Sequence, residues 1–418
     1  MKKIFAVLLV MLLGTANVSF AASTQVDALI EKLTDKGILT KKEAREMKME
    51  IAEDAKALQE DGLKSQLPTW VQNTKLKGDV RVRYQYERRV NDTESRTRGR
   101  VRFRLGLENK INDQWNIGAG LASSESGSSG TDDARSTNMT FNDSFRRGDI
   151  RLDYAYAEYQ PAPWAKIIGG KFVKTNYLWA PTDMLWDTDI NPAGGSIHLE
   201  HKLTDSLEAY VNNGLWVIDE NNKSDRTDPY MIYGQAGLKV TQGILGLNVA
   251  GNYYGFNGVK GITLDGTSAT NTLDGGVLKY DYDAMGASAE FSIKDPTIGL
   301  LPVEKLAFFG DYIQNVDSSV DDKSGWAAGV KIGDEKVAGP KQWQLKYQYT
   351  NLRKDAWLDA FPDSDRLGGA TDVKGQELEL ALGIAKNVTL GFDYYKDMRI
   401  KAAKNPQHIF QADLNIKF

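Results

Sequence analysis

Arginines at alternate positions are the feature of this sequence with the clearest chemical consequence. They recur in three segments, as Arg81, Arg83, Arg100, Arg102, Arg104 and Arg151. In an extended chain, side chains two residues apart point to the same side. The spacing therefore predicts a ladder of guanidinium groups on one face of neighbouring strands. Such a ladder attracts anions, pairs with acids, or sets the ion preference of an aqueous passage that it lines.

A tract rich in carboxylates and tryptophan supplies the opposite charge. It spans residues 175–194 and carries Asp183, Trp186, Asp187 and Asp189. We expect this tract to fold inward as a constriction loop whose acids face the arginines across water, so that the two sets of charge create a field that orients dipolar solutes. A second interpretation stays open, in which the arginines form structural ion pairs with acids close to them in sequence, namely Asp79, Glu87, Glu108 and Asp153.

Other kinds of chemistry find little support in the sequence. His198 and Glu200 would share one face of a strand, while His201 would point the other way, so too few ligands converge for zinc. The chain has no cysteine, which excludes disulfides and thiol catalysis. No Gly-x-Ser-x-Gly motif and no phosphate-binding glycine loop is present. We therefore expect neither a metal site nor a cofactor nor an enzyme.

The first residues are typical of a secretory signal. Lys2 and Lys3 precede an apolar run over residues 4–13, which is too short to span a bilayer. Small residues at Ser19 and Ala21 predict cleavage after residue 21, so the signal peptide is residues 1–21.

Residues 22–68 carry a helical period of apolar residues in two stretches, the second beginning at a Thr40–Glu43 capping box. We expect a helical segment in the periplasm. It is either an α-hairpin spacer or an oligomerising coiled coil, and both readings stay open.

From about residue 76 the apolar period changes to two. Segments of about ten residues alternate apolar with strongly polar side chains, as in Val80-Arg81-Val82-Arg83 and in Ile150, Leu152, Tyr154 and Tyr156 with the residues between them. A soluble β-sandwich shows the same alternation. The strand length, the aromatic residues near strand ends and the secretory signal favour a transmembrane barrel over residues 69–418.

The number of strands and their connections support this interpretation. About sixteen strands are predicted, beginning near residues 76, 98, 115, 149, 164, 195, 206, 230, 243, 280, 303, 325, 341, 375, 387 and 408. Short turns alternate with long loops, as in an up-and-down antiparallel barrel with its termini in the periplasm. The inward faces are charged or amide-bearing, which predicts a water-filled interior.

Several motifs, taken in order, resemble one known family. They are Gly170-Lys171, residues 185–192, Lys354-Asp355-Ala356, Asp363-Ser364-Asp365, Lys374-Gly375, the Gly-Ile-Leu-Thr of residues 37–40, and a terminal Phe418. Together they resemble the "putative porin" family of Gram-negative bacteria. The family's tract ends in Pro-Glu-Gly, whereas this chain has Pro192-Ala193-Gly194.

The resemblance implies an outer-membrane diffusion channel surrounded by lipid. It also implies that the barrel-assembly machinery reads Phe418 as its signal, and it leaves a homotrimer open. The formal net charge of −4 argues against a nucleic-acid partner.

We therefore expect a porin for small hydrophilic solutes or ions. Two alternatives remain, a channel selective for phosphate, another anion or a sugar, and a non-conducting barrel for adhesion or for holding a partner.

Overall fold

The computed structural model describes residues 68–89, 95–125, 134–142, 147–220, 228–296, 303–317, 319–402 and 405–418. The predicted signal peptide and all but the last residue of the predicted helical segment lie outside these residues. The chain divides into two compact units, residues 1–73 and 74–418. The described part of the first unit contains one short helix, α4 (Thr69–Gln72). Among the described residues, no helix combines the length and apolar character needed to cross a bilayer.

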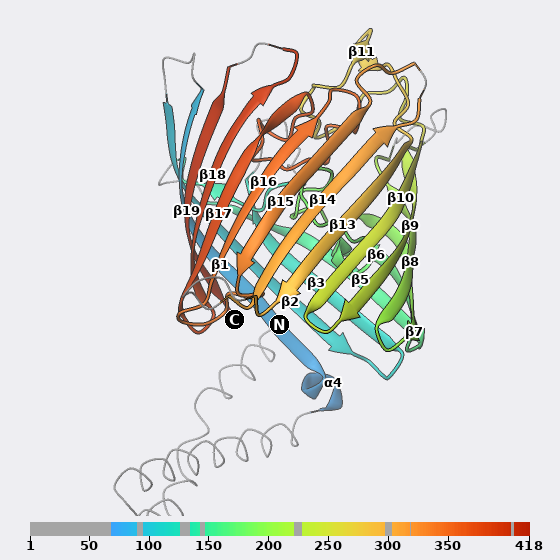
Figure 1. Cartoon of the computed structure of the whole chain (residues 1–418), viewed down its shortest axis with the longest axis vertical. Helices are drawn as coiled ribbons and strands as arrows, with labels where there is room; N and C mark the ends of the chain where they lie inside the picture. The colour runs from blue at the N-terminus through green and yellow to red at the C-terminus, as the bar shows by residue number, and fades with distance from the viewer. Residues whose placement is uncertain are drawn as a thin grey trace, which may run out of the picture. The chain divides into compact units, whose positions relative to one another are not determined.

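The second unit is a closed antiparallel barrel (Figure 1), in which each long strand pairs with the next one along the chain and the last pairs with the first. Its sixteen long strands are β1 (Thr74–Arg89), β2 (Ser95–Lys110), β3 (Trp115–Ser124), β5 (Asp149–Ala162), β6 (Ala165–Lys171), β7 (Ala193–Thr204), β8 (Leu207–Val217), β9 (Tyr230–Gln242), β10 (Leu245–Asn257), β13 (Ala284–Lys294), β14 (Lys305–Asn315), β15 (Ser324–Gly333), β16 (Trp343–Leu352), β17 (Val373–Ala385), β18 (Val388–Arg399) and β19 (Gln407–Lys417). The predicted barrel of about sixteen strands is confirmed, and every predicted start lies within four residues of the observed one.

Three two-residue strands complete the described elements. β4 (Met139–Thr140) pairs with β2 at Arg100 and Val101, beyond the residues of β2 that pair with β3. β11 (Leu273–Asp274) and β12 (Val277–Leu278) form a separate hairpin within the loop that joins β10 to β13.

Long loops and short turns alternate around the barrel. The connections over residues 125–148, 172–192, 218–229, 258–283 and 353–372 are long, whereas those between β5 and β6 or between β17 and β18 have only two residues. Figure 1 shows the long loops at one end of the barrel, and the C-terminus at the other end with the short turns. The predicted alternation of connection lengths is confirmed.

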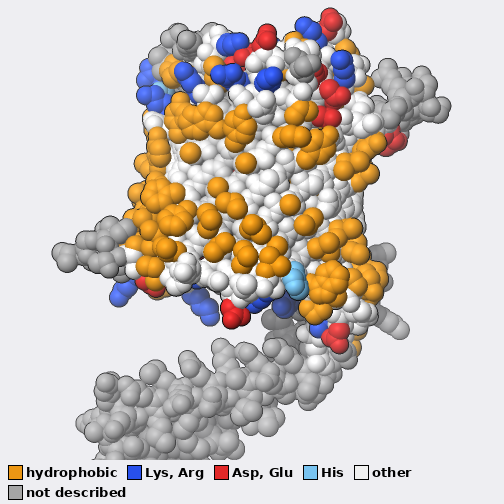
Figure 2. Space-filling view, turned by 45° about the vertical axis from the view of Figure 1, so that its right-hand side comes forward, with side chains coloured by type: hydrophobic (Ala, Val, Ile, Leu, Met, Phe, Trp, Pro, Cys, Tyr) orange, Lys and Arg blue, Asp and Glu red, His pale blue; other side chains and the backbone are white. Residues whose placement is uncertain are grey.

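The period of two separates an apolar outer face from an inner face. On β1, Val82 and Tyr84 face outward and are 47% and 49% exposed. Arg83, which lies between them, and Gln85, which follows Tyr84, are buried in the interior. Figure 2 shows the consequence on one face of the barrel's outer wall, where hydrophobic side chains gather between upper and lower rims that carry the charged side chains.

On β5, two side chains point to the opposite face from the one that the sequence predicts. The sequence places Tyr154 and Tyr156 on the outer face with Ile150 and Leu152, and this is wrong. In the pairing of β3 with β5, Leu121 lies opposite Leu152 but Gly120 lies opposite Tyr154, so Asp153 is an extra residue. This β-bulge reverses the faces beyond it. Tyr154 turns inward and its ring occupies space that a side chain at Gly106 or Gly120 would need.

The interior is not polar throughout, which is a second departure from the prediction. On one side of the barrel, residues from the loops 172–192, 258–283 and 353–372 pack against aromatic side chains of the inner wall to form a buried apolar cluster. Its largest members include Trp186, Trp216, Tyr254 and Trp357. A sixteen-stranded barrel is too wide for wall side chains alone to fill. The folded-in loops occupy that space and confine the polar interior to the remaining side.

The terminal residue contributes to closure, which leads to a first prediction. Phe418 and Gly78 exchange two backbone hydrogen bonds, of 2.9 and 3.0 Å. Deleting Phe418 removes both bonds and should destabilise the refolded barrel by about 2 kcal/mol, since each net hydrogen bond contributes about 1 kcal/mol. Thermal unfolding in detergent measures this loss. Phe418→Ala is the control, because it keeps the backbone bonds and should retain most of the stability. Equal losses in the two variants would contradict the role of the backbone pairing.

Candidate functional site

The loop over residues 172–192 folds into the barrel and is held there by buried groups. The ammonium group of Lys174 donates to the carbonyl oxygens of Asp187 at 2.6 Å and of Ile190 at 3.1 Å. Burial lowers the pKa of Lys174 to about 8. The ring of Trp186 packs 5.2 Å from that of Trp216 and 5.4 Å from that of Trp357. Trp186 therefore anchors the loop in the apolar cluster instead of facing the polar interior.

A second inward loop, residues 353–372, docks on the first. The backbone N–H of Asp187 donates to Phe361 O at 2.7 Å, and the N–H of Ser364 donates to Asp187 Oδ2 at 2.8 Å. The indole N–H of Trp357 donates to Leu185 O at 2.8 Å. In the sequence, Asp363-Ser364-Asp365 belongs to a family motif, and nothing there indicates that these residues lie inside the barrel.

Arg83 is matched by an acid from the other end of the chain. Because β1 pairs with β19, Arg83 lies opposite Asp413, and its Nε and Nη2 each donate to that carboxylate at 2.7 Å. Asp365 of the second loop lies 3.3 Å from the same guanidinium. Arg83 and Asp413 are both buried. A buried pair of this geometry satisfies most of the hydrogen-bonding capacity of both groups.

Arg102 and Arg104 support both interpretations of the arginine ladder, namely pairing with acids close in sequence and contact with acids of the inward loop. Both bind Asp79, at 2.8 and 2.7 Å, which is the pairing with an acid close in sequence. Arg104 also lies 3.3 Å from Asp189 of the inward loop. Asp189 in turn accepts hydrogen bonds from the backbone and side chain of Thr137. Loop acid and wall arginine therefore do meet inside the barrel, at Asp189.

The remaining ladder arginines occupy different surroundings. Arg81 donates to Asn138 at 2.7 Å and lies 3.7 Å from Asp413. Arg100 donates to Gln85 and to Ser136, both at 3.3 Å. Arg151 is 41% exposed and pairs with Asp149 at 3.5 Å. Five of the six predicted arginines are thus gathered on β1 and β2, and Arg151 is separate.

The wall arginines and the loop acids enclose a cavity of about 220 Å³. Five basic and eight acidic residues line it, an acidic excess of 8 − 5 = 3. The basic residues are Arg81, Arg83, Arg102, Arg135 and Lys346, and the acidic ones are Asp183, Asp187, Asp189, Asp363, Asp365, Glu377, Glu379 and Asp393. This cavity is the candidate functional site, and we call it the central cavity.

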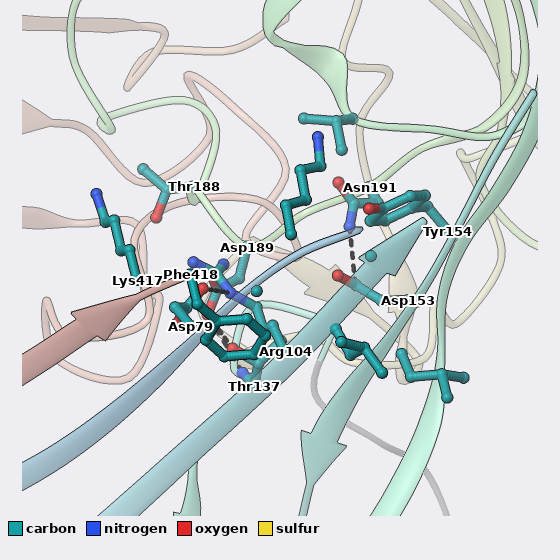
Figure 3. Close-up of a pocket in the computed structure, with 16 residues that line it drawn as sticks. Asp79, Arg104, Thr137, Asp153, Tyr154, Thr188, Asp189, Asn191, Lys417 and Phe418 are labelled. Carbon is teal, nitrogen blue, oxygen red and sulfur yellow. Dashed lines mark hydrogen bonds and ion pairs between the residues drawn. The ribbon is translucent and has the colours of Figure 1, made fainter. Parts of the chain in front are cut away.

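A second cavity of about 340 Å³ adjoins the first (Figure 3). The two share Thr188 and Asp189 as lining residues. Lys417 and Phe418, at the end of the last strand, also line it. In Figure 3, Asn191 donates to Asp153, the bulge residue of β5, at 2.7 Å. The polar interior therefore runs from the central cavity past Asp189 toward the end of the barrel that carries the short turns.

Two cations inside the barrel, one of them buried, were not identified from the sequence. Arg366 of the second loop is 3% exposed and binds Glu377 at 2.7 Å and Asp397 at 3.1 Å. Lys346 binds Glu377 at 3.0 Å and lies 3.9 Å from Asp183. The alternation of Glu377 and Glu379 with leucines was visible in the sequence, but their partners come from other strands and loops.

Arg135 was missed as well, and it joins three loops. Its guanidinium donates to the carbonyl oxygens of Asp359 and Gly369, at 3.0 and 3.1 Å, and to Gly266 O at 3.1 Å. Its own carbonyl accepts from the hydroxyl of Ser364 at 3.1 Å. No sequence motif marks this residue.

The histidines form no metal site in the described part of the chain. His198 lies 2.6 Å from Asn212 Oδ1 and 3.3 Å from Glu200 Oε2. Among the described residues, no group of three or more His, Cys, Asp or Glu side chains has an arrangement able to hold a metal ion.

A closed sixteen-stranded barrel with loops folded into a charged interior is the architecture of a porin-type channel. The family model described as "putative porin" matches residues 85–297 and 277–418, so the chain belongs to this family. Membership indicates the outer membrane of Gram-negative bacteria and a channel rather than an enzyme. The resemblance noted in the sequence is confirmed.

Comparison with solved structures supports the fold. The high-pH structure of OprB from Pseudomonas putida matches with a TM-score of 0.54 at 11% identity, covering 83% of this chain and 94% of that one. A mutant of the Rhodopseudomonas blastica porin matches with a TM-score of 0.43 at 10% identity, covering 82% and 100%. No curated protein matches the sequence.

The Arg366 cluster yields a second prediction. Arg366→Met leaves Asp397 without its buried partner and Glu377 with Lys346 alone, and it should destabilise the barrel by about 3–5 kcal/mol. Urea unfolding in detergent measures the change. The control is Lys401→Met, which removes an exposed ion pair with Asp322 and should leave stability unchanged within error. Equal effects of the two substitutions would show that Arg366 is not held as described.

Asp187 yields a third prediction, on pH. Burial and then the charge of Asp189 raise the pKa of Asp187 to about 7 from its ordinary 3.8. Between these values the folded state holds the proton more tightly than the unfolded state, so the stability that Asp187 contributes falls as pH rises. The stability of the wild type relative to Asp187→Asn should therefore decrease from pH 4 to pH 7.

A pH series of unfolding curves measures this difference, with Asp113→Asn as the control. The hydrogen bond and charge of Lys110 hold the pKa of Asp113 below 3.8. The stability difference between the wild type and Asp113→Asn should therefore change only at lower pH. A stability difference between the wild type and Asp187→Asn that stays constant from pH 4 to pH 7 would contradict the raised pKa of Asp187.

Proposed function

We propose that the protein is a water-filled channel of the outer membrane for the passive diffusion of small hydrophilic solutes and ions. The observation that carries the proposal is the central cavity, in which charged side chains from wall and loops face one another inside a closed barrel. Ionised groups in such number require water, because burying them dry would cost far more than their mutual pairing returns.

The outer wall supports the membrane location. Leucine, valine and isoleucine side chains that the barrel leaves exposed would meet water in a soluble protein, but hydrocarbon in a bilayer. Exposed aromatic residues lie near both ends of the wall. Trp115 begins β3 beside a short turn, and Trp326 lies near the start of β15, beside the loop that follows β14. Aromatic residues at both interfaces are typical of membrane barrels.

We propose that the long loops lie outside the cell and that the short turns lie in the periplasm. In the proposal, residues 1–21 are the cleaved signal peptide, residues 22–68 are the helical periplasmic segment, and the barrel-assembly machinery reads Phe418. The proposal is compatible with a homotrimer.

The charges of the central cavity favour cations over anions. Eight acidic and five basic side chains line it, so the acids are in excess. Acidic linings favour cation passage.

The alternative of a phosphate channel needs arginines that converge without partners. Arg83 and Arg102 are instead bound to Asp413 and Asp79. The structure therefore favours a general channel with a preference for cations.

Reversal potentials across a planar bilayer provide the fourth prediction. Arg81 and Arg104 line the two cavities. Changing both to Gln removes two positive charges from the passage and should shift the reversal potential in a KCl gradient further toward the cation limit.

Arg151→Gln is the matched control, because Arg151 lies outside both cavities and should leave the potential unchanged. An unchanged potential in the double variant would remove the proposed role of the arginine ladder. The absence of any conductance in the wild type would remove the channel itself and favour the non-conducting alternative.

A further inference from the structure

We propose that the inner wall formed by β17, β18 and β19 carries a binding site for a small organic cation with N–H donors, an ammonium or guanidinium group. The site is centred on Asp393 and Gln411, and it rests on the proposed function because both residues line the central cavity. It assigns a solute class to a channel whose family description names none.

Strand register brings the polar groups of this wall together. Glu379 of β17 lies opposite Asp393 of β18, and Asp393 lies opposite Gln411 of β19. These directly paired residues have Cβ atoms about 5 Å apart in an antiparallel sheet. All three line the central cavity, so they form one row of oxygen-bearing side chains across three strands.

Two members of this row lack partners within the described part of the chain. Gln411 is 1% exposed, and neither its Nε2 nor its Oε1 has a hydrogen-bond partner. Asp393 Oδ1 is likewise buried without a partner. Buried polar groups are normally hydrogen-bonded, and those left unpaired at a cavity mark a place where a ligand or ordered water completes the bonding.

The neighbouring cations are already engaged, which leaves Asp393 without an ion pair among the described residues. Arg83, the nearest guanidinium on β1, is held by Asp413 and Asp365. Lys346 is held by Glu377, with Glu379 at 3.6 Å. A carboxylate beside cations that are committed elsewhere favours a mobile cation as its partner.

Acids of the second loop extend the site into the cavity. Asp365 and Asp363 line the same space, and Asp363 Oδ2 accepts no hydrogen bond in the described structure but lies 3.6 Å from Arg366 Nε. A cation lying between loop and wall can therefore donate N–H bonds to Asp393 and Gln411 and also interact with the loop carboxylates. Charge-assisted bonds of this kind are about twice as strong as neutral ones.

Size and bonding capacity select the class of ligand. The cavity of about 220 Å³ is smaller than the sites of drug-sized molecules, which begin at about 300 Å³. Alkali ions can coordinate the oxygens of Asp393 and Gln411, but they bring no N–H donors. A compact ammonium or guanidinium cation supplies both charge and donors.

The experiment is a saturation-transfer NMR titration of the full-length protein in detergent with ethylguanidinium. Saturable binding is expected for the wild type, and tetramethylammonium, which has the same charge and no N–H, should bind at least about tenfold more weakly. Asp393→Asn should raise the dissociation constant for ethylguanidinium at least about tenfold. Asp113→Asn removes the same charge from an exposed turn and should leave it unchanged.

Gln411→Leu separates binding from folding. It removes two unpartnered buried atoms, so it should weaken ethylguanidinium binding several-fold while the thermal unfolding temperature stays equal to that of the wild type or rises.

Equal affinities for the two probe cations, or an unchanged affinity in Asp393→Asn, would overturn the inference. KCl conductance of the same preparation keeps the two proposals apart. A conducting protein that does not bind ethylguanidinium refutes this site alone, whereas a protein without conductance refutes the channel.

Discussion

The pairing of the first strand with the last is the constraint on which the interior depends. Closure places Arg83 of β1 opposite Asp413 of β19, and their bidentate ion pair joins residues separated by 330 positions in the chain. It also brings the arginine-bearing wall of β1 and β2 against the acid-bearing wall of β17 to β19. An open sheet would leave each wall with a large charge of one sign. In the closed barrel the two walls neutralise much of each other's charge and leave a modest acidic excess.

Apolar packing then decides where the loop charges lie. Trp186 and Trp357 hold the loops 172–192 and 353–372 against the inner wall through rings and an indole hydrogen bond to Leu185. Asp189 follows Trp186 by three residues and is therefore held where it meets Arg104. Precise placement of charge in water is difficult for a free loop, because ordering a chain costs conformational entropy. Here the apolar cluster on one side of the barrel compensates that cost and fixes the acids on the other side.

The sequence was sufficient to predict the strands, because a period of two and the contrast between turns and loops are local properties. It also predicted the inward loop and the arginine rows. The bulge at Asp153 could not be predicted, since it depends on how β5 registers with glycines of β3. Nor could the partners of Arg83 or the buried position of Arg366, because both depend on closure and on loops packing from distant parts of the chain. Trp186 was recognised as important but assigned to the passage, whereas its ring is in the apolar cluster.

The central claim is that the charged interior is a continuous wet passage. Single-channel recording of the purified, refolded wild-type protein in symmetric KCl tests it most directly. The account predicts discrete conductance steps with a linear dependence of current on voltage. A protein that inserts into the bilayer and yields no steps would contradict it, and would mean that the inward loops seal the barrel.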